Sequence, residues 1–401
     1  MENAFSDRIT DVPKSFIREI LKVTLDPSII SFAGGLPNRL FFPVKALQKA
    51  SHDVFEEEGG DILQYANSEG YLGLRQFIAD RYRRQEGLEV AVEDILITTG
   101  SQQGLDLLGK TFLNEGDDLI IEEPGYLGAI QAFAMYRPRF HPVPVSEGGM
   151  DLAALARVLG ERRPKLLYTV TNFQNPSGIS YSDANRRAVA DLMRDSSCLV
   201  IQDDPYGDLR FSGTRKVSFK HLLPTNTVLL GSFSKTVAPA LRLGWLVAPP
   251  PLMDKLIIAK QAADLHTNSL AQRILHRFLC DNDLDAHIAT IINQYGRQKE
   301  AMIAAIEQYF PASVKHTNPE GGMFLWVTLP AGMSSMALFE AAIKQKVAFV
   351  PGTPFYVDRK DTNTLRLNFS CADEPTIVEG IRRLGDSIRE LLEEDNSQPL
   401  V

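Results

Sequence analysis

The sequence predicts an α/β protein, with a large domain on a mostly parallel sheet and a smaller α+β domain. Through the middle of the chain, short apolar runs rich in β-branched residues alternate with amphipathic stretches, which is typical of βαβ units. Beyond about residue 291 the order changes to a long helix, separate strands and a closing helix. The 401 residues suffice for two such domains.

The large domain is expected over residues 46–290. Its strand candidates are residues 95–99, 119–122, 165–171, 199–203, 228–231 and 244–247, and its helix candidates include 102–112, 126–136 and 182–195. The small domain is expected to combine residues 291–401 with residues 1–45, which are too few to fold alone. A helix at 285–309 leads into it, and its strands are expected at 321–326 and 364–369.

Composition argues against several classes of protein. The formal charge of −8 and the pI near 5.5 disfavour nucleic-acid binding, which needs a basic face. No basic, apolar leader begins the chain, and no apolar run reaches the roughly 18 residues that span a membrane. The three cysteines lie far apart and no metal-binding spacing occurs, so we expect a cytoplasmic protein with reduced thiols and no metal.

Polar clusters rich in glycine and proline follow successive strand candidates. They are residues 100–103, 123–126, 172–178, 203–206 and 232–235. One such cluster alone would be an ordinary loop with turn residues. Because ligands bind beyond the carboxyl ends of parallel strands, the series predicts one site assembled from several loops.

The most specific signal is the segment SFSKTVAPALRLG at residues 232–244. An amine is a nucleophile only when unprotonated, and burial or neighbouring cations lower the pKa of a lysine. Serines flank Lys235, and Arg242 follows it by seven residues, which suits a phosphate-bearing aldehyde. A single lysine would most simply be a solvated surface residue, but the combined spacing favours a cofactor lysine.

A carboxylate and an arginine extend this candidate site. Asp203 follows an apolar strand, and a carboxylate buried there is costly unless a cation such as a protonated pyridine nitrogen pairs with it. Asp204 is a competitor for this role. Arg366 lies within an alternating strand, and for an isolated strand an arginine on the polar face is the simpler interpretation.

Segment 232–244 resembles the cofactor-lysine motif of the class I/II aminotransferases, which are pyridoxal-phosphate enzymes of fold type I. The other strand-end clusters match that family in order, so the resemblance covers nearly the whole chain. Residues 31–37 and 64–70 resemble the 2-aminoadipate/kynurenine aminotransferase branch. The resemblance implies a mostly parallel, seven-stranded sheet and pyridoxal 5′-phosphate as the cofactor.

The resemblance also assigns roles toward the cofactor. Lys235 would bind its aldehyde, Asp203 its ring nitrogen, and Tyr126 would stack on its ring, while Asn175 and Tyr206 would contact the ring oxygen. The phosphate would be bound by Ser101, Gln102, Ser232, Ser234, Arg242 and, from the other subunit of a homodimer, Tyr65.

Toward the substrate, the resemblance assigns the α-carboxylate to Arg366, with Asn175 beside it. Gly35 resembles part of a flexible loop that closes over the substrate. Arg18 aligns with an arginine that recognises the substrate side chain, although a charged residue on an amphipathic helix would look the same. Residues 38–41 depart from that loop's usual sequence, so the side-chain preference stays open.

The expected function is transfer of an amino group from an L-amino acid to a 2-oxo acid such as 2-oxoglutarate, in ping-pong order. The donor would be 2-aminoadipate, an aromatic or a branched-chain amino acid. A β-lyase, decarboxylase or racemase is an alternative on the same fold. A non-catalytic cofactor sensor is another, but such proteins carry a basic DNA-reading domain, and here the aminotransferase-like sequence begins near Val12. The absence of a Gly-x-Gly-x-x-Gly fingerprint or a P-loop disfavours a nucleotide-binding protein.

Overall fold

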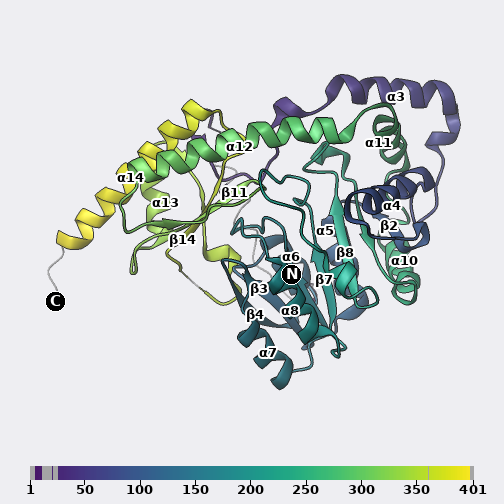
Figure 1. The fold of residues 1–401 in the computed structure, drawn as a ribbon, viewed down its shortest axis with the longest axis horizontal. Helices are drawn as coiled ribbons and strands as arrows, with labels where there is room; N and C mark the ends of the chain where they lie inside the picture. Colours follow the sequence, from purple (N-terminus) through teal and green to yellow (C-terminus); the bar gives the residue numbers. More distant parts are fainter. Residues whose placement is uncertain (1–4, 11–19, 21–25, 360, 398–401) are drawn as a thin grey trace.

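The computed structural model describes residues 5–10, 20, 26–359 and 361–397. Its centre is a sheet in the strand order β2-β9-β8-β7-β6-β3-β4-β5 (Figure 1). The strands are β2 (Ile95–Thr98), β3 (Asp118–Glu123), β4 (Arg139–Ser146), β5 (Gly149–Met150), β6 (Leu166–Thr169), β7 (Leu199–Asp203), β8 (Thr227–Ser232) and β9 (Gly244–Val247). Strands β4, β3, β6, β7 and β8 pair in parallel, whereas β9 is antiparallel to both neighbours and β5 is antiparallel to β4. The predicted mostly parallel sheet is confirmed, and the two-residue β5 is added to the seven expected strands.

Strand β4 is absent from the sequence-based candidates because Pro142 and Pro144 interrupt its pattern. Proline cannot donate to a neighbouring strand and is confined to edges and bulges. Strand β4 pairs along its length with β3, but β5 pairs only with its last two residues, so most of its other side is an edge. The fold therefore tolerates both prolines there.

Helices cover the sheet (Figure 1). Serine and aspartate side chains cap several of them: Ser182 accepts a hydrogen bond from the backbone of Asn185, and Asp151 accepts one from Ala154. The helices are α3 (Val44–Glu58), α4 (Leu72–Glu86), α5 (Ser101–Phe112), α6 (Leu127–Ala134), α7 (Leu152–Glu161), α8 (Asp183–Met193), α9 (Phe219–Leu222), α10 (Pro250–Asp264) and α11 (Ser269–Asp281). A short helix, α1 (Asp7–Thr10), and 3-10 turns at η2 (Arg39–Phe41), η3 (Gly59–Leu63), η4 (Val92–Asp94), η5 (Pro239–Leu241) and η6 (Thr353–Phe355) complete the helical segments.

A second, antiparallel sheet forms in the C-terminal part of the chain, in the order β10-β11-β14-β13. Its elements are β10 (Lys315–His316), β11 (Phe324–Thr328), β13 (Val350–Pro351) and β14 (Thr364–Asn368), with the helices α12 (Leu284–Tyr309), α13 (Ser335–Lys344) and α14 (Glu374–Ser397). Near the N-terminus, β1 (Ile30–Ser31) pairs in parallel with β12 (Val347–Ala348). The β1 segment thus lies against the last third of the chain.

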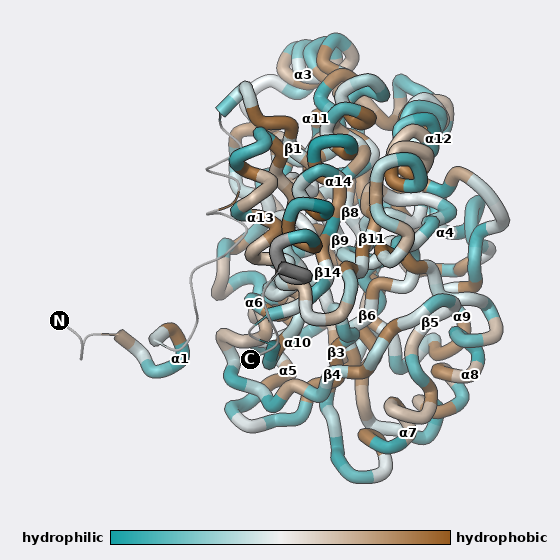
Figure 2. The backbone as a smooth tube through the Cα atoms, turned by 90° about the vertical axis from the view of Figure 1, so that its left-hand side faces the viewer, coloured by the Kyte–Doolittle hydropathy of each residue, from teal (hydrophilic) through white to brown (hydrophobic). Residues whose placement is uncertain are grey.

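One apolar cluster joins the two sheets. It contains Leu230 and Leu246 of the large sheet, Phe324 and Leu367 of the second sheet, and Tyr295 of the long helix α12. In Figure 2 the apolar segments gather in the central strands, while outer helices such as α3 and α12 alternate between hydrophilic and hydrophobic residues. The sheets are therefore packed around shared apolar surface, and the division at residues 45/46 and 290/291 stays a prediction. Within the described residues, no helix is both long and apolar enough to cross a bilayer.

We expect Leu246→Ala to lower the free energy of unfolding by roughly 2–5 kcal/mol, because it removes buried methyl groups and leaves a cavity. Leu246 is fully buried in β9. The control is Leu192→Ala, since Leu192 on α8 is 37% exposed, and its effect should stay within about 1 kcal/mol. Urea denaturation measures both, and equal losses would contradict the packing described here.

Candidate active site

A cavity of about 380 Å³ opens at the carboxyl ends of the central strands. Its walls come from the loops that follow β2, β3, β6, β7 and β8, from Gly35 near the N-terminus, and from β14. The lining residues are Gly35, Gly100, Ser101, Gln102, Tyr126, Val170, Asn175, Asp203, Pro205, Tyr206, Ser232, Ser234, Lys235, Pro239, Arg242 and Arg366. Every residue that the sequence assigned to the cofactor or substrate lines it, except Tyr65 and Arg18.

Tyr65 and Arg18 are the two exceptions. Tyr65 lies outside the cavity, is 80% exposed and meets the His266 ring edge-on at 6.0 Å between centroids. Arg18 lies outside the described residues. The chain by itself therefore brings Tyr65 to the surface, and its predicted contact with a neighbouring subunit stays a prediction.

Lys235 presents an amine of lowered basicity to the cavity. Burial, together with the positive charges of Arg366 and Arg242, lowers its pKa to about 8 from the usual 10.5. Its Nζ donates a hydrogen bond to the Gly35 carbonyl at 2.7 Å and lies 5.9 Å from the centre of the Tyr206 ring. The lowered pKa enlarges the unprotonated, nucleophilic fraction of this amine near neutral pH, where the protonated form still predominates.

Asp203 ends β7 with a buried, half-satisfied carboxylate. Its Oδ2 accepts a hydrogen bond from the Tyr168 hydroxyl at 2.9 Å, whereas Oδ1 is buried without any partner among the described residues. Burial raises the pKa of Asp203 to about 7. A buried carboxylate oxygen with no donor is costly, so this atom suits a protonated, cationic ligand atom in the cavity.

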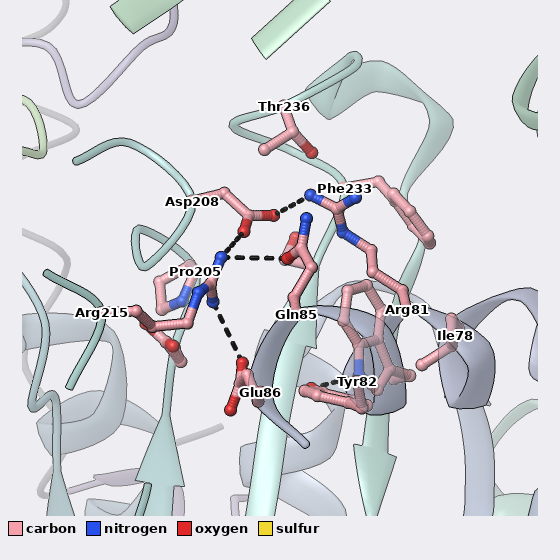
Figure 3. Close-up of a pocket in the computed structure, with 13 residues that line it drawn as sticks. Ile78, Arg81, Tyr82, Gln85, Glu86, Pro205, Asp208, Arg215, Phe233 and Thr236 are labelled. Carbon is pink, nitrogen blue, oxygen red and sulfur yellow. Dashed lines mark hydrogen bonds and ion pairs between the residues drawn. The ribbon is translucent and has the colours of Figure 1, made fainter. Parts of the chain in front are cut away.

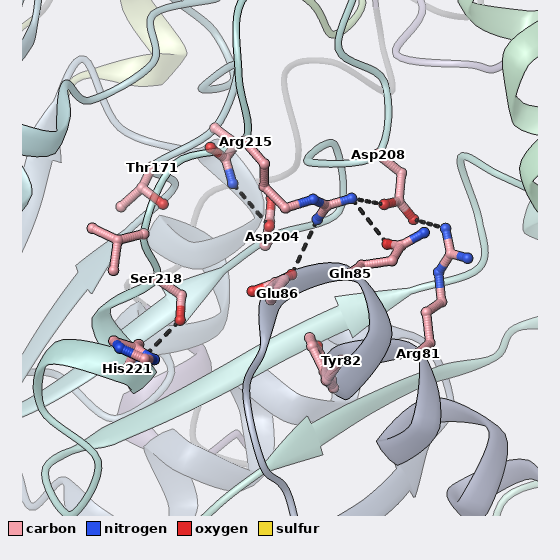
Figure 4. Close-up of polar contacts among 12 residues, drawn as sticks. Arg81, Tyr82, Gln85, Glu86, Thr171, Asp204, Asp208, Arg215, Ser218 and His221 are labelled. Atoms are coloured by element: carbon pink, nitrogen blue, oxygen red, sulfur yellow. Dashed lines mark hydrogen bonds and ion pairs between the residues drawn. The ribbon is translucent and has the colours of Figure 1, made fainter.

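Asp204, the competing carboxylate, lies on the other side of the strand end. Successive residues of a strand point to opposite faces. Asp204 lines a separate cavity of about 50 Å³, where its Oδ2 accepts a hydrogen bond from Asn172 at 2.9 Å. Figure 3 shows the ion pairs of that cavity, in which Arg215 bridges Glu86 and Asp208, and in Figure 4 Asp204 lies beside them.

Arg366 is a cation buried among neutral groups. Its side chain is 2% exposed, and it donates to the Asn175 Oδ1 and to the Ala33 carbonyl, each at 2.8 Å. Its guanidinium carbon lies 4.4 Å from the centre of the Phe324 ring, and its Nε is buried with no partner in the described part of the chain. Burial lowers the pKa of Arg366 to about 10. A guanidinium held in this way is suited to a carboxylate supplied by a ligand.

The helix α5 begins at the cavity wall with Ser101, and its first backbone N–H groups lack helical partners. Arg242 also lines this part of the cavity. It lies two residues before β9 and has a left-handed backbone conformation with φ 54°. Gly100 has φ 74°, and an added Cβ would lie 2.5 Å from Arg242 Nη2, so this position requires glycine. Ser232 Oγ accepts from the backbone N–H of Ser234 at 3.1 Å. These donors form a cradle for an anion such as phosphate.

The residues present fit pyridoxal phosphate. The unpartnered Asp203 oxygen matches a protonated pyridine nitrogen, the donors around Ser101 and Arg242 match a phosphate, and the desolvated Lys235 amine matches an aldehyde.

Several residues in and below the cavity received no role from the sequence. Gly100, Pro205 and Pro239 line it from segments that the sequence singled out, and Val170 lines it from a predicted strand, but none of the four carries side-chain chemistry that a pattern could identify. Below it, Glu122 is a buried carboxylate at the end of β3. The signal that identified Asp203, an acidic residue closing an apolar strand, was present there as well.

The family model and the known proteins that resemble this chain all point to one family. Residues 29–384 match the family model described as aminotransferase class I and II. The chain is 42% identical to a 2-aminoadipate transaminase of Thermus thermophilus, covering 97% of each chain. It is 39% identical to aromatic-amino-acid aminotransferase 1 of Thermococcus litoralis, over 97% of this chain and 95% of that protein.

A solved structure agrees with these relatives. The α-aminoadipate aminotransferase of Thermus thermophilus, in complex with N-(5′-phosphopyridoxyl)-L-leucine, superimposes with a TM-score of 0.91 at 40% identity. The alignment covers 98% of this chain and 99% of that one. With the cavity and its donor set, these likenesses show that the chain belongs to the class I and II aminotransferases, pyridoxal-phosphate enzymes of fold type I.

Proposed function

We propose that this aminotransferase moves the amino group of L-2-aminoadipate, an aromatic or a branched-chain L-amino acid to a 2-oxo acid such as 2-oxoglutarate, in ping-pong order. One observation carries the proposal: two opposite charges, each lacking a partner of the other sign among the described residues, share one cavity with a desolvated amine. They belong to Arg366 and Asp203, and the amine is that of Lys235. The names of the two curated relatives and the leucine adduct of the solved structure support these donor classes.

Bound pyridoxal phosphate supplies an aldehyde that condenses with amines and a ring that accepts the electrons released at the substrate α-carbon. Asp203 would keep a proton on the ring nitrogen through Oδ1, while the Tyr168 hydroxyl holds that carboxylate by its other oxygen. Tyr126 would pack against the ring, and Asn175 and Tyr206, joined by a hydrogen bond of 3.3 Å, would bind the ring oxygen.

The chain's cations and hydroxyls bind the phosphate. Ser101 and Gln102 offer the start of α5, while Ser232, Ser234 and Arg242 close the cradle from the strand β8 side. Because Arg242 would neutralise the phosphate, it would help to hold the cofactor without depending on Lys235.

Lys235 and Arg366 act on the substrate. Arg366 binds the α-carboxylate and fixes which α-carbon bond faces Lys235. Once free of the cofactor, the Lys235 amine would accept the substrate α-proton as a general base and return a proton as a general acid. The first 2-oxo acid must leave before the second enters, because both bind at the same site.

Space for the substrate side chain lies beside the main cavity. A second cavity of about 700 Å³ shares Pro239 with it and is lined by residues 36–42 together with Gln294, Gln298, Cys371 and Asp373. Its mixture of apolar residues such as Leu36 and Leu40 with Arg39 supports acceptance of both apolar and acidic side chains. Gly35 and Leu36 would adjust as the loop that closes over the substrate.

We further propose that the enzyme is a cytoplasmic homodimer in which Tyr65 reaches the phosphate of the other subunit. Large apolar side chains exposed between residues 36 and 72 support a covered surface: Leu36, Leu40, Val44, Phe55, Leu63 and Leu72. The three free cysteines suit a reducing compartment. The large and small domains are proposed as residues 46–290 and as 1–45 with 291–401.

Replacement of the cofactor lysine tests the proposal directly. Lys235→Ala should lose multiple turnover between an amino acid and 2-oxoglutarate, and borohydride should fix no cofactor to the chain, because the attacking amine is gone. Lys255→Ala, on the exposed side of α10, is the control and should keep both properties. Turnover retained in Lys235→Ala would refute the assignment.

The lowered pKa of Lys235 predicts the pH at which cofactor capture becomes fast. Below about pH 8 the amine is mostly protonated and cannot attack, so the rate of covalent capture by the cofactor-free protein should rise with pH and level off above about 8. Stopped-flow absorbance measures this rate. A rate still rising steeply toward pH 10.5, the usual pKa of lysine, would contradict the effect of burial and of the two arginines.

A further inference from the structure

Glu122 is a buried carboxylate outside the cavity for which the proposed mechanism has no use. It is 1% exposed at the end of β3. Its Oε1 accepts hydrogen bonds from the Thr169 hydroxyl at 2.6 Å, the Tyr181 hydroxyl at 2.7 Å and the Val170 backbone at 3.0 Å. Its Oε2 accepts one from Gln174 Nε2 at 3.0 Å. None of these four partners carries a charge, and the Val170 N–H and the Gln174 Nε2 can only donate, so each oxygen of Glu122 must accept.

Gln174 links Glu122 to the loop that follows β6. Its Nε2 also donates to the Pro124 carbonyl at 2.6 Å, and its Oε1 accepts from the backbone and the hydroxyl of Ser177 at 2.9 and 2.6 Å. The fully buried amide thereby uses both its donors and its acceptor. It ties the loop after β3, which leads to Tyr126, to the turn at residues 174–178, whose Gly178 N–H returns to the Gln174 carbonyl at 2.6 Å.

The residue next to Gln174 is Asn175, which joins the cavity. Asn175 accepts a hydrogen bond from Arg366 and donates one to Tyr206. A guanidinium must be held within a fraction of an ångström to bind a carboxylate through both nitrogens. The position of Arg366 therefore depends on the turn that carries Asn175. The Gln174 side chain holds this turn through its hydrogen bonds to Glu122, Pro124 and Ser177.

We propose that Glu122 is a positioning residue: through the Gln174 side chain it fixes the turn bearing Asn175, and through Asn175 it fixes Arg366 for the substrate carboxylate. This inference rests on the proposed function of Arg366. It assigns to Glu122 a role in substrate affinity, although Glu122 lines neither the main cavity nor its neighbour.

Glu122→Gln is the discriminating change because it keeps the shape and alters only one oxygen. The oxygen of the new glutamine side chain would face the three donors that Oε1 now accepts from. Its NH₂ group would then face Gln174 Nε2, so that two hydrogen-bond donors would oppose each other. Gln174 must then rotate its oxygen toward position 122 and release Ser177. Tyr181→Phe is the matched control, because it removes one donor from Oε1 and leaves the contact between Oε2 and Gln174 in place.

The readout is the affinity of the holoenzyme for 4-methylpentanoate, the unreactive carboxylate that corresponds to leucine without its amino group. We expect calorimetry to give a dissociation constant raised about tenfold in Glu122→Gln and less than about twofold in Tyr181→Phe, while both variants lower the melting temperature. In single-turnover reactions with L-leucine, the loss in Glu122→Gln should fall on apparent affinity more than on the limiting rate.

Two further variants separate the possible failures. Arg366→Lys should weaken binding of 4-methylpentanoate strongly; if it binds as well as the wild type, the proposed function of Arg366 fails. If Arg366→Lys binds weakly but Glu122→Gln binds normally, or no worse than Tyr181→Phe, the Glu122 inference alone is overturned. Should Glu122→Gln not fold, Gln174→Met removes the same bridge and must show the same loss of affinity for the inference to stand.

Discussion

The site depends on an unsatisfied charge at the end of β7. Asp203 is buried with one oxygen held by Tyr168 and the other without a donor in the described structure, an arrangement that costs free energy until a cation arrives. Strand β7 lies in the middle of the large sheet, with β6 and β8 on either side, and this position fixes the carboxylate while excluding water from it. In the proposed site, a cofactor with a protonated ring nitrogen would supply the missing partner of this carboxylate.

The second requirement is that distant parts of the chain converge on one cavity. The strand ends of the sheet provide Asp203 and Lys235, whereas Arg366 comes from the C-terminal sheet. The segment after β1 lies between the two cations: the Ala33 carbonyl accepts from Arg366, and the Gly35 carbonyl accepts from Lys235. Pairing of β1 with β12 brings that segment there. Arg366, the proposed substrate-binding residue, is thus joined by a hydrogen bond to the N-terminal segment that precedes the residue 36–42 loop.

Much of this could be predicted from the sequence, because the strands of the large sheet are short, apolar and followed by turn residues. The segment 232–244 and the strand-end clusters identified the residues of the cavity wall, since each combines an unusual residue type with a fixed spacing. Strand β4 was missed because Pro142 and Pro144 are informative only once its place near the edge is known. Strand β11 begins at Phe324 and not at residue 321, because Gly322 has a positive φ of 77° that interrupts extended pairing.

Roles set by tertiary contacts could not be predicted. The distinction between Asp203 and Asp204 depends on which cavity each side chain lines, and the role proposed for Glu122 depends on donors that lie 47 to 59 residues away in sequence. Tyr65 illustrates the same limit, because the resemblance assigns it to a neighbouring subunit and the single chain leaves it 80% exposed. Local pattern identifies residue types, and packing decides what they contact.

The most direct test of this account is the protonation state of the cofactor's ring nitrogen in the holoenzyme. Nitrogen NMR on protein reconstituted with ¹⁵N-labelled pyridoxal phosphate reports it at slightly alkaline pH, where an ordinary pyridine is uncharged. The account predicts a protonated nitrogen in the wild type and an unprotonated one in Asp203→Asn, because a buried carboxylate opposite the ring favours the cation. An unprotonated nitrogen in the wild type would contradict the pairing with Asp203 on which the proposed site depends.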